Sequence, residues 1–450
     1  MILSASECYL SQKMLHNIWS RVLFSLFVNL CLVHSFQVEP SNDLRILLKN
    51  SRFPQDESPK NNPISSPVVL VPGDGGSQLE ARLSKSYKYH HVCKSTSDWY
   101  QIWLNIHLLM PIAFDCLSDN LRLHYDQQTR RTRNTEGVEI RARDFGSLLS
   151  VDYLDAMRLP QLNYFEGLIE NMESNNGLKR DVDMVAAPYD FRKAPNELDD
   201  FFANFTKLIE EEYIRSNYKP VTLVCHSMGC LNSIHLLNQK SNDWKQVYIR
   251  RLIALAAPFG GSTKSIYAML FGDNFNIPLL NKFKLRELQS TFPSLMYLFP
   301  REVSFSINKT FVQTPSVNYT LKNLDQLFLN MNLSDQYQMW LDTRKLASSL
   351  RAPDVELWCL YGTGINTIES IIYHDDPSTR LRNSSEDRHY VLWGDGDGAV
   401  NVESLRYCEE FRLHQSKPVW IREFPQLDHR SILRDPDALN FITNHIMTQE

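Results

Sequence analysis

The residues with the clearest capacity for chemistry lie in the stretch Val-Thr-Leu-Val-Cys-His-Ser-Met-Gly-Cys, residues 221–230. Its first four residues predict a short buried strand, and residues 231–237 have helical spacing. Ser227 therefore stands at a sharp strand-to-helix turn, where a helix N-terminus favours negative charge on its hydroxyl. Gly229 is the small residue expected two positions later, whereas Cys225 replaces the glycine expected two positions earlier. We interpret Ser227 as a nucleophile; the alternative is a strand–turn–helix with an incidental serine.

A nucleophilic serine needs a base and a carboxylate that orients the base, and candidates for both follow later strands. The stretch Gly-Asp-Gly-Asp-Gly, residues 394–398, offers Asp397 as the preferred carboxylate and Asp395 as the alternative. It lacks the acidic series of a calcium loop, and we expect neither a metal nor a cofactor. His429 follows the last predicted strand and is positioned to take the Ser227 proton and return it to a leaving alcohol.

A glycine-rich turn, Asp-Gly-Gly-Ser-Gln-Leu at residues 74–79, follows an early apolar strand at residues 68–71 that Pro-Gly terminates. Backbone N–H groups at such a turn and directly after the nucleophile stabilise a tetrahedral oxyanion. We therefore expect the N–H groups of Asp74 and Met228 to form the oxyanion hole.

Further apolar runs predict strands near residues 182–186, 221–225, 252–257, 356–361 and 419–424, with helical stretches between them. This alternation predicts a mostly parallel sheet with helices on both faces. The chain order Ser, Asp, His matches the α/β-hydrolase fold, which is our predicted fold class. Irregular residues from about 260 to 300 indicate an inserted cap or lid.

The 450 residues carry a net charge of −5 and are 43% hydrophobic, which excludes a basic nucleic-acid footprint and supplies ample core. An apolar run at residues 22–33 after Lys13, His16 and Arg21 predicts a signal peptide over residues 1–35. A polar, proline-containing arm over residues 36–66 then precedes a hydrolase domain at residues 67–450. The alternatives for the leader are an uncleaved anchor and a misassigned start codon.

Cysteines and sequons also indicate passage through the endoplasmic reticulum. Removal of Cys8 and Cys31 with the leader leaves six cysteines. Two of them, Cys225 and Cys230, flank the strand-to-helix turn at Ser227, which we call the elbow, and we expect them to be free buried thiols. That leaves Cys93–Cys116 and Cys359–Cys408 as candidate disulfides. Five Asn-X-Ser/Thr sequons are candidate glycosylation sites: Asn204, Asn308, Asn318, Asn332 and Asn383.

The segment between Cys93 and Cys116 is apolar on nearly every side. A buried helix is one explanation. A small excursion at about residues 84–120 would have little protein to bury it, however, so we predict a lipid-facing flap. The predicted membrane-binding residues are Trp99, Trp103, Leu104, Leu108 and Leu109.

Seven segments, in order along the chain, together resemble the lecithin:cholesterol acyltransferase family. They are Val-Pro-Gly-Asp-Gly-Gly-Ser-Gln-Leu-Glu-Ala (71–81), Ile-Trp-Leu-Asn (102–105), Ala-Pro-Tyr-Asp-Phe-Arg (187–192), His-Ser-Met-Gly (226–229), Ala-Pro-Phe-Gly-Gly (257–261), Cys-Leu-Tyr-Gly-Thr-Gly (359–364) and Gly-Asp-Gly-Asp-Gly (394–398). The resemblance runs from about residue 68 to the C-terminus.

The resemblance implies the same roles for the site residues as the motifs do. Ser227, Asp397 and His429 match the family's triad, and Asp74 and Met228 match its oxyanion hole. It also implies the two disulfides named above, a membrane-binding segment inside the first, and a mobile lid at about residues 260–300. The sequence departs from the family's usual residues at Cys225, Phe191 and Phe259 and in the residues on either side of His429.

Asp74 points to one branch of the family, because the lysosomal phospholipase A2 branch has aspartate here and the plasma acyltransferase has cysteine. We therefore expect a serine phospholipase and acyltransferase that passes a fatty acyl group from a glycerophospholipid to water or to a lipid alcohol such as ceramide. The expected partner is a phospholipid membrane or lipoprotein surface, and the expected location is the lysosome or the extracellular space. The alternatives are a sterol-acylating enzyme and a catalytically silent lipid-binding protein.

Overall fold

The computed structural model describes residues 66–274, 282–376 and 389–447. The chain divides into two units, residues 1–62 and 63–450, and every described residue belongs to the second. The predicted signal peptide and nearly all of the predicted arm at 36–66 lie outside the described residues. Among the described residues, no helix is long and apolar enough to cross a membrane.

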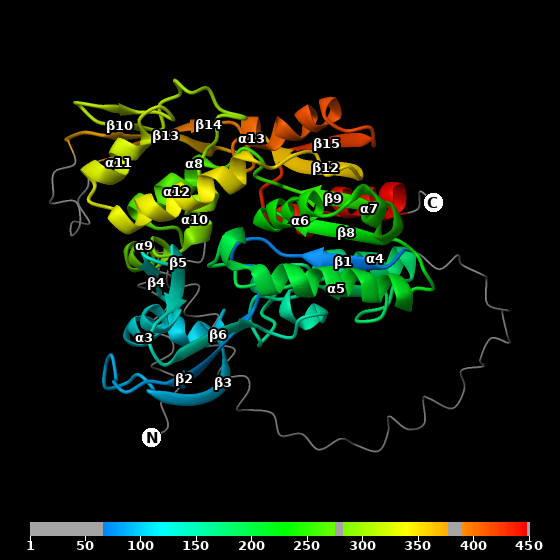
Figure 1. Ribbon diagram of the computed structural model, residues 1–450, viewed down its shortest axis with the longest axis horizontal. Helices are drawn as coiled ribbons and strands as arrows, with labels where there is room; N and C mark the ends of the chain where they lie inside the picture. The colour runs from blue at the N-terminus through cyan, green and yellow to red at the C-terminus, as the bar shows by residue number, and fades with distance from the viewer. Residues whose placement is uncertain (1–65, 275–281, 377–388, 448–450) are drawn as a thin grey trace, which may run out of the picture. The chain divides into compact units, whose positions relative to one another are not determined.

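A six-stranded sheet forms the centre of the second unit (Figure 1). All of its strand pairs are parallel. In spatial order the strands are β15 (Val419–Pro425), β12 (Glu356–Thr363), β9 (Ile249–Leu255), β8 (Val221–His226), β1 (Val68–Val71) and β7 (Met184–Ala186). The six strands predicted from apolar runs are these six.

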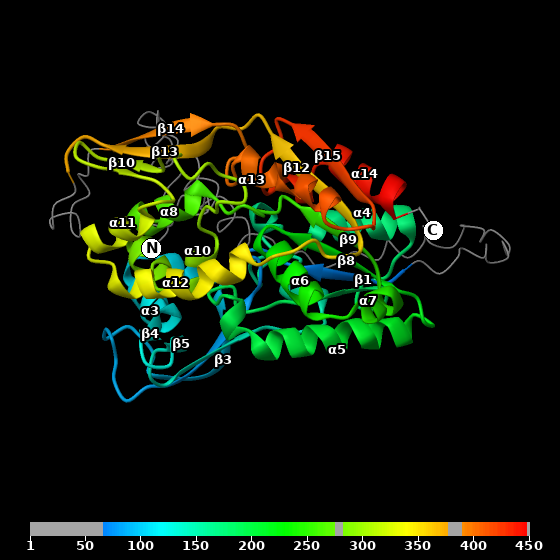
Figure 2. The same cartoon turned by 45° about the horizontal axis from the view of Figure 1, so that its top comes forward.

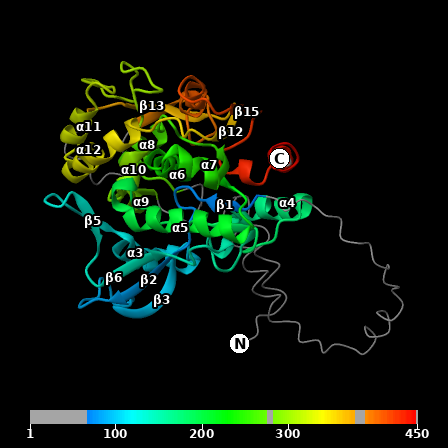
Figure 3. The ribbon, with the colours of Figure 1, turned by 45° about the vertical axis from the view of Figure 1, so that its right-hand side comes forward.

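Helices cover both faces of this sheet, which is why β1 and β8 are buried along their whole length. On one face lie α5 (Asp199–Arg215), α6 (Met228–Gln239) and α7 (Asn242–Tyr248), in contact with β8 and β9. On the other lie α4 (Glu166–Asn176) and α14 (Pro436–Phe441), which pack against each other. Figure 3 shows α4 and the C-terminal stretch on the side opposite α6 and α7. The parallel sheet between two helical layers is the predicted α/β-hydrolase fold.

Smaller sheets and helices extend the domain beyond the ends of the main sheet (Figures 1 and 2). One group joins the sheet β11 (Asn318–Tyr319), β10 (Val312–Gln313), β13 (Thr367–Tyr373) and β14 (His389–Gly394) to helices α8 (Thr263–Phe271), α10 (Pro293–Tyr297), α11 (Leu324–Asn330) and α12 (Ser334–Ser348). The other contains β2 (Leu79–Ser84), β3 (Thr96–Trp103), β6 (Val138–Ala142), α3 (Pro111–Leu121), β4 (Leu123–Asp126) and β5 (Arg131–Asn134). Helix α9 (Lys282–Gln289) contacts both α3 and α8.

The segment predicted as a cap or lid contains α8, α9 and α10, and residues 275–281 within it lie outside the described residues. Its helices are rich in buried apolar residues, among them Ile266, Met269 and Leu285. The described residues of this segment contribute helices rather than a strand of the main sheet, and its role as a lid stays a prediction.

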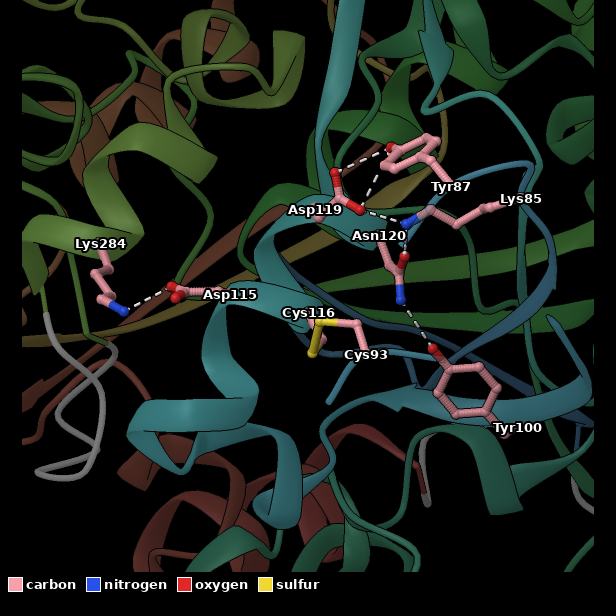
Figure 4. Close-up of a disulfide and its surroundings, with 9 residues drawn as sticks. All are labelled: Lys85, Tyr87, Cys93, Tyr100, Asp115, Cys116, Asp119, Asn120 and Lys284. Carbon is pink, nitrogen blue, oxygen red and sulfur yellow. Dashed lines mark hydrogen bonds and ion pairs between the residues drawn. A yellow bond between two sulfur atoms is a disulfide. The ribbon is translucent and has the colours of Figure 1, made fainter. Parts of the chain in front are cut away.

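The structure contains both predicted disulfides. Cys93 bonds Cys116 with Cα atoms 5.4 Å apart, and Cys359 bonds Cys408. Figure 4 shows that the first bond joins the loop before β3 to α3, close to buried Lys85. Lys85 donates to Asn120 at 2.8 Å and pairs with Asp119, so an ion pair and a disulfide together brace this excursion.

Candidate active site

Ser227 occupies the turn between β8 and α6, with φ 52° and ψ −127°. A non-glycine residue rarely adopts positive φ, and such strain concentrates at functional turns. The Ser227 N–H donates to the carbonyl oxygen of Leu255 at 2.9 Å, which fixes the turn against β9. A side chain on Gly229 would come within 2.5 Å of the Val71 carbonyl oxygen, so glycine is required there for α6 to approach β1.

The structure brings Ser227, His429 and Asp397 together, although they come from three separate segments. His429 Nε2 lies 3.0 Å from Ser227 Oγ, and His429 Nδ1 lies 2.7 Å from Asp397 Oδ2. The His429 N–H also donates to the Asp397 carbonyl oxygen at 2.8 Å, which holds the two loops side by side. This arrangement allows His429 to accept the Ser227 proton while Asp397 stabilises the resulting imidazolium.

Asp397 is fully buried, and its second oxygen is saturated by backbone donors. Oδ1 accepts from the N–H groups of Ala399 at 3.0 Å and Val400 at 2.7 Å. The alternative carboxylate, Asp395, instead accepts from the Gly364 N–H at 2.6 Å, and His429 is not among its hydrogen-bond partners. The geometry therefore favours Asp397 over Asp395 as the partner of His429.

The loop predicted to supply the second oxyanion donor lies against the elbow. A Cβ on Gly73 would meet Ser227 Cβ at 2.7 Å, which places this loop in direct contact with Ser227. Among the described residues, neither the Asp74 N–H nor the Met228 N–H donates a hydrogen bond to another protein atom. Both groups therefore remain available for an oxyanion, and their use in the reaction stays a prediction.

Asp74 has an unusual acidity for a carboxylic acid. Loss of hydration on burial and, to a smaller extent, the nearby Asp273 carboxylate together raise the pKa of Asp74 to about 7. The Lys264 ammonium and the Gly75 N–H oppose this rise. Lys264 is itself paired with Asp273 at 3.0 Å, so most of its charge is compensated locally. Asp74 is therefore protonated in acidic solution and ionised in alkaline solution.

Two residues of the site received no role in the sequence analysis. Tyr164 and His226 are both buried, and the Tyr164 hydroxyl lies 2.6 Å from His226 Nδ1. His226 had a detectable signal, because it directly precedes the nucleophile. Tyr164 had none, since it stands in a stretch without a motif, and only the folded chain brings it to the elbow.

The prediction that Cys225 and Cys230 are free thiols is wrong, because the structure joins them in a disulfide with Cα atoms 4.9 Å apart. The elbow reverses the chain, so the residue two positions before Ser227 lies beside the residue three positions after it. This bond also gives the Cys225 side chain, which is larger than the expected glycine, a covalent partner in α6.

The six cysteines of the three disulfides should not react with a thiol reagent in the unreduced, denatured protein. Peptide mapping should link Cys225 to Cys230. Replacing both by alanine should lower the free energy of unfolding by about 2 kcal/mol, because a short loop is released in the unfolded chain. Two reactive thiols per molecule would contradict the pairing.

The prediction of a lipid-facing flap is wrong for Trp103, Leu104 and Leu109, each of which is buried. β3 pairs with β2, and its end packs into the core, where the Trp103 indole donates to the Gly75 carbonyl oxygen at 2.9 Å. Trp99 and Leu108 are partly exposed, and the Arg141 guanidinium lies 4.1 Å from the Trp99 ring. Among the described side chains of the excursion, the most exposed apolar ones are instead Tyr89, Val92 and Met110.

Comparisons with known proteins agree with this architecture. A model of the Lecithin:cholesterol acyltransferase family matches residues 99–440. The chain is 36% identical to Lysosomal phospholipase A and acyltransferase of Homo sapiens, over 89% of this chain and 93% of that protein. It is 38% identical to Phosphatidylcholine-sterol acyltransferase of Gallus gallus, over 88% and 94% respectively.

Among solved structures, the Tle4–Tli4 complex contains a chain similar to this one, with a TM-score of 0.52 and 13% identity. The likeness covers 85% of this chain and 98% of that one and shows a shared fold alone. The family match and the two relatives decide the classification: this protein belongs to the lecithin:cholesterol acyltransferase family.

Proposed function

We propose that the protein is a serine phospholipase A and acyltransferase. The observation that carries this proposal is the hydrogen-bonded series Ser227–His429–Asp397 in a member of a family of acyltransferases. A buried, strained serine with an imidazole at 3.0 Å is poorly explained by lipid binding alone, since a binding protein has no use for all three groups.

In the first half-reaction Ser227 Oγ attacks the ester carbonyl of a glycerophospholipid while His429 Nε2 takes the hydroxyl proton. The N–H groups of Met228 and Asp74 stabilise the tetrahedral oxyanion. Collapse of this intermediate returns the proton to the leaving lysophospholipid alcohol and leaves an acyl-serine. In the second half-reaction water or a lipid alcohol gives its proton to His429 and takes the acyl group.

We assign the substrate as a lipid ester at a membrane or lipoprotein surface, with water or a lipid alcohol such as ceramide as the acyl acceptor. The names of the relatives support both a lysosomal phospholipase and a sterol acyltransferase, at nearly equal identity. Asp74 favours the first, because a carboxyl group with a pKa of about 7 is neutral beside the oxyanion only in acidic surroundings. We therefore place the protein in the acidic lysosome, the extracellular space or both, reached through the endoplasmic reticulum.

The asparagines of four sequons are exposed, as glycosylation requires: Asn204, Asn308, Asn318 and Asn332. Asn383 lies outside the described residues. Exposed Tyr89, Val92 and Met110 replace the buried tryptophan and leucines as the apolar contacts that the excursion offers to a lipid surface.

The test supplies phosphatidylcholine vesicles that contain either ceramide or cholesterol, at an acidic and at a neutral pH, and identifies the acylated products by mass spectrometry. Free fatty acid and acyl-ceramide, formed mainly in acid, support the proposal. Cholesterol ester formed at neutral pH would favour the sterol-acylating alternative. Absence of every product, with no labelling by a serine-reactive lipid probe, would identify a lipid-binding protein instead.

Replacing Asp74 by asparagine should extend activity toward alkaline pH. In the unchanged protein the rate should fall as pH rises through about 7, because ionised Asp74 repels the forming oxyanion. Asparagine cannot ionise, so this decline should disappear from a plot of kcat against pH. Asp273→Asn is the control of opposite sign: removing its charge should lower the pKa of Asp74 and move the decline to lower pH. An unchanged profile in both variants would contradict a role for Asp74 in the pH optimum.

A further inference from the structure

A series of hydrogen bonds, two of them fully buried, connects three loops at the candidate active site. The Gly73 N–H donates to the Tyr164 hydroxyl at 2.9 Å, and that hydroxyl lies 2.6 Å from His226 Nδ1. His226 Nε2 lies 2.9 Å from the carbonyl oxygen of His429. The three loops follow β1, β8 and β15 and carry the oxyanion donor, the nucleophile and the general base respectively.

The direction of every proton in this series follows from elementary valence. A carbonyl oxygen can only accept, so His226 Nε2 must carry a proton and donate to His429. Full burial keeps the ring neutral, so Nδ1 carries no proton and accepts. Tyr164 therefore donates its single hydroxyl proton to Nδ1, and its oxygen accepts from Gly73. All four polar groups are satisfied in one arrangement, which fixes the tautomer of His226.

The surroundings of His226 hold it in this neutral form. Burial lowers the pKa of His226 well below its ordinary value, and the neighbouring His429 and Arg430 lower it further. The centroids of the His226 and His429 rings are 4.8 Å apart. A charge on His226 would therefore oppose the imidazolium that forms on His429 when Ser227 is deprotonated.

We propose that Tyr164 and His226 are positioning residues for acyl transfer, which hold the His429 loop and the Gly73 loop in register with Ser227. The backbone of His429 is then fixed on both sides, through its N–H to Asp397 and through its carbonyl oxygen to His226. Fixing this backbone fixes where the imidazole points. The proposal rests on the proposed acyl-transfer function, and neither residue contacts the reacting atoms in it.

Three variants separate the links of the series. Tyr164→Phe removes the acceptor of Gly73 and the donor to His226. His226→Asn keeps an acceptor near the Nδ1 position and loses the donor to His429, whereas His226→Gln places an amide donor near the Nε2 position. We expect kcat to fall about ten- to a hundredfold in Tyr164→Phe and His226→Asn, because a displacement of about 1 Å at a catalytic base has effects of this size. His226→Gln should recover part of that loss.

The KM for a soluble short-chain ester should stay within about twofold of the unchanged protein, since the missing interactions orient the base rather than bind substrate. Tyr361→Phe is the matched control. It also removes the hydroxyl of a buried tyrosine, one that donates to Glu423 at 3.1 Å and is not part of the series from Gly73 to His429. Its melting temperature should fall, with kcat unchanged.

Activity of the unchanged protein distinguishes a failure of the proposed function from a failure of the positioning role. If it transfers no acyl group, the proposed function fails; if it is active and His226→Asn and Tyr164→Phe keep kcat within twofold, the positioning role fails. Loss of kcat only in proportion to loss of stability, with no recovery in His226→Gln, would also overturn it. Nitrogen-15 NMR of labelled histidine in the unchanged protein gives a measurement that does not depend on the folding of the variants. At the pH of maximal activity His226 should show a protonated Nε2 and an unprotonated Nδ1. The opposite tautomer, or an imidazolium signal at that pH, would refute the proposal.

Discussion

Replacing Ser227 by alanine should abolish acyl transfer, with a fall in kcat of about four to six orders of magnitude. The hydroxyl is the only atom group removed, and it lies 3.0 Å from the base that activates it. The backbone of the turn is held by the Ser227 N–H and by the packing of Gly229, which alanine leaves intact. Hydrolysis of phosphatidylcholine, formation of acyl-ceramide and labelling by a serine-reactive probe should disappear together.

Ser233→Ala is the matched control for this experiment. Ser233 lies on the same helix, is fully buried, and donates only to the Gly229 carbonyl oxygen at 2.8 Å. Its loss should cost about 1 kcal/mol of stability and leave kcat nearly unchanged. Vesicle binding, measured by co-sedimentation, should be the same in both variants. Retention of more than about one-hundredth of the original rate by Ser227→Ala would disprove the assignment of the nucleophile.

Asp397→Asn should lower kcat by about four orders of magnitude, for a reason that the geometry makes specific. Two backbone N–H groups occupy one oxygen of Asp397, so the amide oxygen of asparagine must take that place. The amide nitrogen then faces His429 Nδ1 and donates to it. His429 is forced to carry its proton on Nε2, where it cannot accept the proton of Ser227.

Asp395→Asn tests the alternative carboxylate under the same conditions. Asp395 accepts one hydrogen bond from the Gly364 N–H, and asparagine can preserve that bond through its amide oxygen. We expect its kcat to stay within a few-fold of the unchanged protein. The opposite ranking, with Asp395→Asn the more damaging change, would transfer the role from Asp397 to Asp395. The melting temperature of each variant shows whether a loss of rate reflects unfolding.

The six strands of the main sheet could be predicted from sequence because a parallel strand covered on both faces needs an unbroken apolar run. The relation of Ser227, Asp397 and His429 could be predicted for a related reason. The carboxyl ends of parallel strands meet at one edge, so polar residues that follow those strands converge there. Pattern and chain order suffice for both conclusions.

The burial of the aromatic excursion could not be predicted from the local sequence pattern. Trp103 and Leu109 are apolar whether they face lipid or protein, and the sequence contains no sign of the partner that covers them. The pairing of β3 with β2 and the packing of Trp103 on Phe191 supply that partner from residues distant in the chain. Burial is a property of the assembled domain.

By itself, the sequence determined the fold class, the nucleophile elbow and the order of the three candidate catalytic groups, since each depends on short-range pattern and chain order. Only the tertiary structure decided that Cys225 pairs with Cys230, that Asp397 rather than Asp395 contacts His429, and that Tyr164 reaches His226. Those contacts depend on distances of a few ångströms between loops. The packing of the whole sheet and its helices sets such distances, and no local propensity encodes them.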